Sequence, residues 1–246
     1  MQTLISRRSI LLQLAALVLT AVVFGIWPQI DVDVARLFVR DDGLFVGVSV
    51  TGHVLRNILY ALPLVLGGGL LLIWLAARWH MPKWPVPSNR AIAFMLISLA
   101  LGPGLLVNGV LKEVSHRPRP FHVTQVQGLG GKWDFRPWYR FDGQCESNCS
   151  FVSGEASAAM WTLAPALVAP LPVRALAIGA SILVTVATGL WRMALGGHFL
   201  SDVLMGALLT SLTVCLLYLA MFRHSGPGRP DLHEVVKASY KDKLYR

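Results

Sequence analysis

Six long apolar runs limit what this chain can fold into more than any other feature. A helix that crosses the hydrocarbon core of a bilayer needs about 20 predominantly apolar residues. The segments that meet or approach this length are residues 10–27, 54–77, 90–111, 154–169, 174–191 and 200–222. In lipid, each segment must satisfy its own backbone polar groups. The sequence therefore predicts an all-α, polytopic membrane helix bundle of about six transmembrane helices.

The charged residues agree with this class. They make up 14% of the 246 residues, whereas a soluble domain carries about a quarter. The net charge of +9 is spread over loops beside the apolar runs and forms no single basic face, which argues against nucleic acid as a partner. For the cations outside the segments 112–120, 150–155 and 192–202, positive-inside anchoring in a membrane is the favoured interpretation.

The first apolar run has the features of a retained membrane span. It follows Arg7 and Arg8, is too long for the apolar region of a signal peptide, and precedes no small-residue cleavage site. The Lys and Arg residues near the span ends then favour both termini in the cytoplasm. We predict one membrane-embedded domain over residues 1–224, with a motif-bearing core at about 90–222 and a short cytoplasmic tail at 225–246.

The fourth run, residues 154–169, is short for a span and contains Pro165. A buried re-entrant segment is the alternative to a span there. If residues 154–169 are counted as a span, three polar segments fall on the same side of the membrane. They are residues 112–120, 150–155 and 192–202. Side chains that are far apart in the sequence can then converge at one end of the bundle.

The loops on that side carry two further features. Residues 31–39 are predicted to form a short interfacial helix. Cys145 and Cys149 flank three polar residues, and their spacing is not that of a zinc site. A small disulfide is one of two alternatives for this pair if the loop faces an oxidising compartment. Cys215 lies in an apolar run and is predicted to be an inert packing residue.

The segment 192–202 supplies a candidate nucleophile. His198 and Asp202 are four residues apart, a spacing that places them on one helix face. Asp202 is expected to accept the Nδ1 proton of the imidazole and leave Nε2 free to attack. Arg192 precedes a flexible Gly-Gly turn that can bring its guanidinium to a phosphate. For the segment alone, an ordinary interfacial hydrogen bond between His198 and Asp202 is the alternative.

The segment 112–120 supplies positive charge. Prolines follow both Arg117 and Arg119, and they stiffen the chain in an extended form. Such a segment can hold Lys112 and Arg119 around one anion, with the guanidinium suited to bidentate contact with phosphate oxygens. A basic patch attracted to anionic headgroups is the alternative for this segment alone.

The segment 150–155 supplies backbone donors. Ser153 and Gly154 precede a predicted helix, where N–H groups and the helix dipole favour an anion. A simple helix cap is the common alternative.

In combination, the three segments resemble the motifs of the type 2 phosphatidic acid phosphatase family, which shares its site with bacterial acid phosphatases and vanadium haloperoxidases. The matching residues are Lys112 and Arg119-Pro120, then Ser153-Gly154 at a helix start, then Arg192, His198 and Asp202. The resemblance covers about residues 90–222, and the layout of six spans is also similar.

This resemblance implies a role for each matching residue. His198 attacks phosphorus and forms a phosphohistidine, and Asp202 orients its imidazole. The groups that hold the phosphate oxygens are Lys112, Arg119, Ser153, the Gly154 amide and Arg192. The resemblance implies no metal ion and no cofactor, because fixed cations neutralise the charge that a metal would otherwise neutralise.

The sequence departs from the family pattern at two positions. Glu155 stands where the family has a histidine that protonates the leaving group. Glu155 is expected to donate that proton if it stays protonated in a desolvated site, and otherwise His116 is the nearest candidate. Trp191 stands where the family has a serine before its arginine, so that a hydroxyl donor is lost while the nucleophile is kept.

These observations together predict an enzyme that removes phosphate from a membrane lipid at the periplasmic face of a bacterial inner membrane. Candidate substrates are lipid A, undecaprenyl pyrophosphate, phosphatidylglycerophosphate and phosphatidic acid. The long loop 121–149, which carries Trp and Arg residues, favours a large headgroup and thus lipid A or a polyprenyl carrier. A lipid phosphotransferase and a non-catalytic lipid-binding or transport protein are the alternatives, although a transporter is disfavoured by spans that contain almost no charge.

Overall fold

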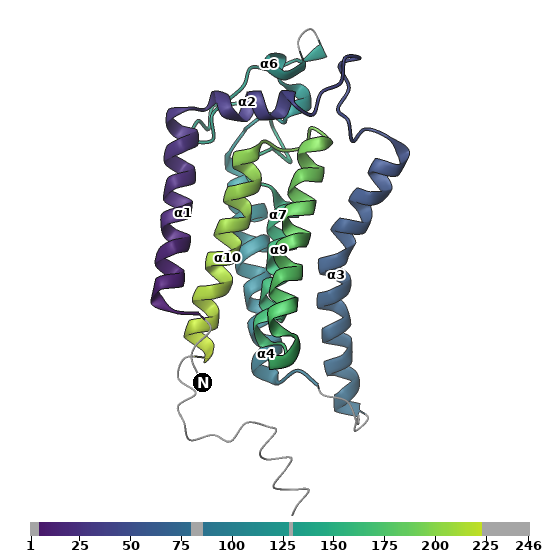
Figure 1. Cartoon of the computed structure of the whole chain (residues 1–246), viewed down its shortest axis with the longest axis vertical. Helices are drawn as coiled ribbons and strands as arrows, with labels where there is room; N and C mark the ends of the chain where they lie inside the picture. The colour runs from purple at the N-terminus through teal and green to yellow at the C-terminus, as the bar shows by residue number, and fades with distance from the viewer. Residues whose placement is uncertain (1–4, 80–85, 128–129, 223–246) are drawn as a thin grey trace, which may run out of the picture.

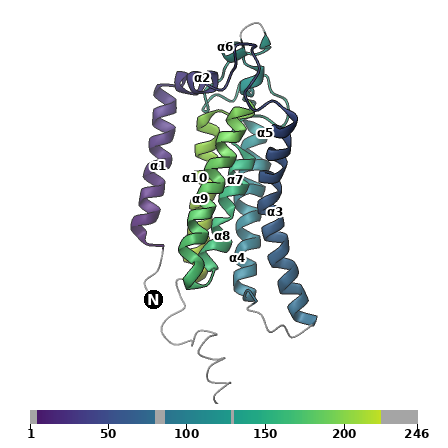
Figure 2. The same ribbon diagram turned by 45° about the vertical axis from the view of Figure 1, so that its right-hand side comes forward.

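A computed structural model describes residues 5–79, 86–127 and 130–222 of the chain. Within these ranges the chain forms helices and loops, with two isolated β-bridges. Long helices stand side by side, and short helices lie across one end of the bundle (Figures 1 and 2). The elements in chain order are α1 (Arg7–Ile26), α2 (Gln29–Arg36), α3 (Val50–Trp79), α4 (Asn89–Leu99), the π-helix η1 (Ala100–Leu111), α5 (Lys112–Val114), the 3₁₀ turn η2 (Pro120–His122), α6 (Thr124–Gln127), α7 (Gly154–Trp161), α8 (Leu163–Val168), α9 (Leu171–Ala194) and α10 (Leu200–Phe222).

Five helical segments in the described ranges are long and apolar enough to cross a membrane. They are Arg7–Ile26, Val50–Arg78, Asn89–Val114, Leu171–Ala194 and Leu200–Phe222. The first two bury only 6% of their most apolar windows within the protein, so that Leu and Val side chains point outward, as a surrounding lipid phase requires. The prediction of an all-α polytopic membrane bundle is confirmed.

The third span changes its helical geometry along its length. α4 is a regular α-helix, and it passes into the wider turns of η1, which contain Pro103. A proline has no N–H for the α-helical bond and its ring displaces the preceding turn, which favours a wider helix. The side-chain amide of Asn108 donates to the carbonyl of Pro103 at 2.7 Å. The span then ends in α5, whose first residue is Lys112.

Residues 154–169 differ from the other predicted spans because they form two short helices, α7 and α8. The break falls at Thr162, whose hydroxyl donates to the carbonyl of Ala159 at 2.7 Å and contacts the hydroxyl of Ser181 at 2.8 Å. Pro165 has no N–H to continue the bonding to Trp161. The pair lies inside the bundle among α4, α9 and α10 (Figures 1 and 2). Because protein surrounds both helices, their break is not exposed to lipid.

The core of the bundle is organised around Trp161 at the end of α7. Its side chain is buried, and its indole N–H contacts both the carbonyl of Met95 and the hydroxyl of Ser98 at 3.1 Å. A Cβ atom on Gly67 would lie 2.7 Å from the indole ring, so glycine lets α3 approach closely here. This packing fixes α7, and hence the residues that precede it, relative to α3 and α4.

One end of the bundle, called here the α2 end, carries residues 27–49, 115–127, 130–153 and 195–199 (top of Figure 1). The described N-terminal residues lie at the opposite end. The three polar segments singled out in the sequence therefore meet at the α2 end, and the short helix predicted near residues 31–39 is present as α2. The predicted tail lies outside the described residues, so that the single domain over residues 1–224 stays a prediction.

Candidate active site

His198 is buried in the turn between α9 and α10, with 2% of its surface exposed. Its Nδ1 lies 2.7 Å from the carbonyl oxygen of Ser150. Because a carbonyl oxygen only accepts, Nδ1 carries the proton of the neutral imidazole and Nε2 keeps its lone pair. Burial, followed by the charges of Arg192, Arg119 and Lys112, holds the pKa of His198 well below its ordinary value. The imidazole is therefore in its neutral form, which is the form that nucleophilic attack through Nε2 requires.

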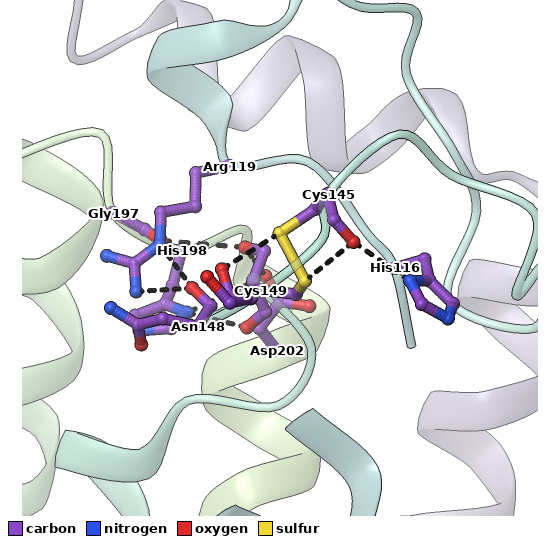
Figure 3. Close-up of a disulfide and its surroundings, with 10 residues drawn as sticks. His116, Arg119, Cys145, Asn148, Cys149, Gly197, His198 and Asp202 are labelled. Atoms are coloured by element: carbon purple, nitrogen blue, oxygen red, sulfur yellow. Dashed lines mark hydrogen bonds and ion pairs between the residues drawn. A yellow bond between two sulfur atoms is a disulfide. The ribbon is translucent and has the colours of Figure 1, made fainter. Parts of the chain in front are cut away.

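Asp202 lies beside this histidine but bonds to other groups (Figure 3). Its Oδ2 is 3.9 Å from His198 Nδ1, and it accepts hydrogen bonds from the Ser150 hydroxyl at 2.6 Å and the Phe199 N–H at 2.8 Å. Instead of the direct hydrogen bond expected from the four-residue spacing, Ser150 lies between the two side chains and bonds to each of them. The carbonyl of Ser150 fixes the imidazole, and its hydroxyl fixes the carboxylate. Asp202 in turn caps the first turn of α10.

A buried ion network fixes the other oxygen of Asp202. Arg117 is 1% exposed, and it donates to Asp202 Oδ1 at 2.5 Å and to Asp31 Oδ2 at 2.7 Å. Its guanidinium carbon also lies 4.5 Å from the ring centre of Phe199. Asp31 accepts from the N–H and the hydroxyl of Ser201 at 2.9 and 2.6 Å. The network joins α2, the segment before η2 and the start of α10.

The structure places the three predicted phosphate-binding cations around His198. Arg119 donates from Nε and Nη2 to the carbonyl of Asn148 at 3.1 and 2.8 Å (Figure 3). Arg192 is buried, and its Nε has no hydrogen-bond partner among the described residues. Lys112 begins α5 at the end of the third span. All three charges act on the pKa of His198, so a phosphate at Nε2 would lie within reach of their fields.

The position of Arg192 depends on Gly197. A Cβ atom at residue 197 would lie 2.3 Å from Nη2 of Arg192, which means that the guanidinium packs directly on the glycine backbone. The neighbouring Gly196 has φ +67 and turns the chain from α9 toward His198. The Gly-Gly turn therefore sets the position of the Arg192 guanidinium relative to His198.

Ser153 and Gly154 form the start of α7, as predicted. The Ser153 hydroxyl oxygen accepts from the N–H of Ala156 at 3.3 Å, and the Ser153 N–H donates to the Asp202 carbonyl at 3.0 Å. The capping hydroxyl keeps its own proton for a further acceptor. A Cβ atom on Gly154 would lie 2.6 Å from Oδ1 of Asn108, so only glycine fits this approach. The first turn of α7 thus presents donors beside His198 that suit an anion.

Glu155 is bound by two arginines. Its Oε1 accepts from Arg56 Nε at 3.1 Å and Nη2 at 2.6 Å, and its Oε2 lies 3.5 Å from Arg192 Nε. Both carboxyl oxygens of Glu155 thus face guanidinium groups, which are hydrogen-bond donors only. This geometry favours a positioning role for Glu155 over the proton-donating role expected from its place in the motif.

Arg56 is a site residue that the sequence reasoning missed. It lies on α3, one of the long apolar helices, and it reaches Glu155 across 99 residues of sequence. Trp191 makes a second contact with the same helix, because its indole N–H donates to the Gly52 carbonyl at 2.9 Å. Both departures from the family pattern therefore bind the start of α3. In the sequence, a single arginine near the start of an apolar run is the feature that could have identified Arg56 as a site residue.

His116, the other candidate proton donor, does not face His198. Its Nδ1 lies 2.9 Å from the carbonyl of Cys145, and its ring is on the far side of the Cys145–Cys149 disulfide from His198 (Figure 3). The disulfide itself is present, which settles the two alternatives for that loop. Cys215 is buried and unpaired, as predicted.

Comparisons with known proteins place the chain beside membrane phosphatases. Residues 91–225 match the model of the PAP2 superfamily. A lipid A 4'-phosphatase from Francisella tularensis subsp. novicida (strain U112) is 34% identical over 155 residues, which cover 63% of this chain and 68% of that protein. A lipid A 4'-phosphatase from Rhizobium leguminosarum is 32% identical over 221 residues, which cover 81% of this chain and 90% of that protein.

One solved structure shares the fold. It is the crystal structure of a transmembrane PAP2 type phosphatidylglycerolphosphate phosphatase from Bacillus subtilis. The match has a TM-score of 0.59 at 21% identity, and it covers 89% of this chain and 98% of the other. At this identity the likeness concerns the arrangement of the helices.

Replacing Arg117 tests the ion network. Arg117→Met leaves two carboxylates, Asp31 and Asp202, buried without their cation, and breaking such a pair costs about 3–5 kcal/mol. We expect a large fall in the thermal unfolding temperature of the purified protein in detergent. Arg40→Met, at an exposed pair with Asp42, serves as the control and should change stability little. Equal stability of the two variants would contradict a structural role for the network.

Replacing Gly197 tests the position of Arg192. In Gly197→Ala the new methyl group meets the end of a flexible side chain, so the guanidinium moves while the fold is kept. We expect turnover of a lipid phosphate to fall by about tenfold or more, with little change in the unfolding temperature. Gly179→Ala, at an open position in α9, is the control. Unchanged turnover in Gly197→Ala would show that this guanidinium position does not limit the reaction.

Proposed function

Because this chain belongs to the PAP2 superfamily and is a membrane lipid phosphatase, we propose that it removes the 4'-phosphate of lipid A through a phosphohistidine on His198. The supporting observation for the chemistry is the buried, neutral His198 with Nε2 unprotonated among three cations. The supporting observation for the substrate is the identity of 32–34% to lipid A 4'-phosphatases, of which the aligned regions cover 68% and 90%.

In the proposed first step, Nε2 of His198 forms a bond to phosphorus. The bond from phosphorus to the lipid oxygen breaks, and this oxygen keeps the electron pair and takes up a proton from solvent water. The imidazole becomes positively charged as the bond forms. Its Nδ1–H then donates more strongly to the Ser150 carbonyl, and the Asp202 carboxylate, 3.9 Å away, offsets the new charge. Water hydrolyses the phosphohistidine in the second step.

The cations and donors stabilise the transition state. Lys112, Arg119 and Arg192 neutralise the charge on the transferred phosphoryl oxygens, and the Ser153 hydroxyl and the Gly154 N–H add hydrogen bonds. Fixed cations do here what a metal ion does in many other phosphatases, so we propose a metal-independent reaction. Turnover in the presence of a chelator would agree with it.

Glu155 is proposed to position the cations. Its two oxygens contact Arg56 and Arg192, and this holds the two guanidinium groups on one side of His198. Arg56 then adds a further positive charge from α3. This additional cation suits a substrate with a large, anionic, sugar-containing headgroup, because it offers a further positive charge for the headgroup to bind.

We further propose that the α2 end faces the periplasm of a bacterium and that the protein lies in the inner membrane. The loop cations favour a cytoplasmic N-terminus, and the described N-terminal residues lie at the opposite end of the bundle (Figure 1). The disulfide between Cys145 and Cys149 is at the α2 end, which agrees with an oxidising compartment on that side.

Phosphate release by the purified protein tests this proposal. We expect the rate of 4'-phosphate removal from lipid A to exceed the rates of phosphate release from phosphatidylglycerophosphate, phosphatidic acid and polyprenyl pyrophosphate. Mass spectrometry of the lipid product identifies which phosphate of lipid A is removed. His198→Ala should lower turnover by at least about 10³-fold because the nucleophile is lost. His116→Asn, in which asparagine tolerates the observed φ of 49, should lower it far less. Preference for the 1-phosphate or for another lipid would overturn the substrate, and substantial turnover by folded His198→Ala would overturn the nucleophile.

Glu155→Gln separates positioning from proton donation. The amide keeps the shape but loses the charge that pairs with Arg56 and Arg192. We expect losses of about tenfold that are alike on lipid A and on an activated aryl phosphate, whose leaving group needs no proton. Glu113→Gln, at an exposed position in α5, is the control. A loss confined to lipid A would instead assign the proton donor to Glu155.

A further inference from the structure

The Cys145–Cys149 disulfide lies directly beside the site. Cys149 is fully buried and Cys145 is 6% exposed, although both belong to a loop at the α2 end. In Figure 3 the disulfide is drawn between His116 on one side and Arg119 and His198 on the other. The part of the chain that the structure describes shows no bond between either sulfur and the His198 imidazole, so any influence of the disulfide on the reaction acts through the chain around it.

Two carbonyl groups next to Cys149 hold site residues. The carbonyl of Asn148 accepts both hydrogen bonds from Arg119, at 3.1 and 2.8 Å. The carbonyl of Ser150 accepts the hydrogen bond from His198 Nδ1 at 2.7 Å. A segment of three residues therefore sets the distance between one cation and the nucleophile, and Cys149 is its central residue.

Main-chain hydrogen bonds join this loop to the segment that carries His116 and Arg117. The Ser150 N–H donates to the Arg117 carbonyl at 2.9 Å, and the Cys145 N–H donates to the His116 carbonyl at 3.2 Å. Between these two bonds the chain reverses, and Asn148 adopts φ 50, a left-handed conformation that asparagine tolerates. The disulfide closes this reversal and limits the conformations open to it.

We propose that the Cys145–Cys149 disulfide is a positioning element of the active site, which holds the Asn148 and Ser150 carbonyls in place for Arg119 and His198. The inference rests on the proposed roles of these two residues. Its consequence is that turnover depends on the oxidation state of the disulfide, although the disulfide takes no part in the phosphate chemistry.

Reduction by a dithiol would release this constraint. The dithiol supplies two electrons and two protons, the S–S bond breaks to give two cysteine thiols, and the dithiol closes to a cyclic disulfide. The loop then gains conformational freedom. Arg119 loses its fixed acceptor, and the Nδ1–H of His198 loses the carbonyl that keeps Nε2 unprotonated. Both changes slow the attack of Nε2 on phosphorus in each molecule, because the nucleophile and one cation are no longer held in place.

The test measures turnover per active site in lipid nanodiscs before and after treatment with dithiothreitol. The amount of competent enzyme is taken from the burst of phosphoenzyme, and the thiol state is checked by alkylation and mass spectrometry. We expect kcat per site to fall by about tenfold to about a hundredfold, with a smaller change in KM, and to recover on reoxidation. A disulfide that served stability alone would reduce the number of competent sites and leave kcat per site unchanged.

Cysteine variants supply the matched controls. The double variant Cys145→Ser, Cys149→Ser should be as slow per site as the reduced protein and should not respond to dithiothreitol. Cys215→Ser, which changes the remaining cysteine, should keep both the full rate and the response. Verified reduction without a change in kcat per site, or a double variant with the full rate, would overturn the proposal. The proposed function is tested by a different result, namely turnover by His198→Ala.

Discussion

The buried positive charge of Arg117 is the constraint on which the arrangement of the α2 end depends. An arginine that is 1% exposed must have its charge neutralised, because an unpaired ion in a low-dielectric interior is costly. Asp31 and Asp202 supply the negative charge that neutralises Arg117, and the ring of Phe199 covers its guanidinium. Asp202 is thereby fixed, its second oxygen fixes the Ser150 hydroxyl, and the Ser150 carbonyl fixes His198. The buried ion pairs and the contacts that orient His198 thus form one connected set.

The membrane explains why such a polar set can exist at the end of an apolar bundle. Outward side chains meet lipid, so polar groups turn inward and pair with one another. The Ser157 and Thr210 hydroxyls lie 2.5 Å apart in the interior, and the Trp161 indole bonds to α4. These contacts hold α7 beneath the site. Because α7 begins at Gly154, directly after the capping residue Ser153, they also determine where its first-turn N–H groups point.

The two residues that depart from the family pattern contact the same helix, α3. Glu155 replaces a histidine and binds Arg56, and Trp191 replaces a serine and binds the Gly52 carbonyl. Each substituted residue therefore contacts the start of α3. This helix brings a further cation to the site, and the loss of a proton donor is accompanied by the gain of a positive charge. The resulting site is richer in fixed cations than the motif residues alone would provide.

The helical membrane class, the convergence of three polar segments, the short helix α2 and the start of α7 after Ser153 could all be predicted from the amino-acid sequence. Hydropathy and capping are local properties, so a window of about 20 residues suffices to predict them. The partners of the charged groups, in contrast, depend on how the helices pack in three dimensions. Arg117 and Asp31 are 86 residues apart, and Arg56 and Glu155 are 99 apart. The four-residue spacing of His198 and Asp202 likewise did not reveal that Ser150 stands between them, because a hydrogen bond depends on where packing places the atoms, and no local pattern encodes that position.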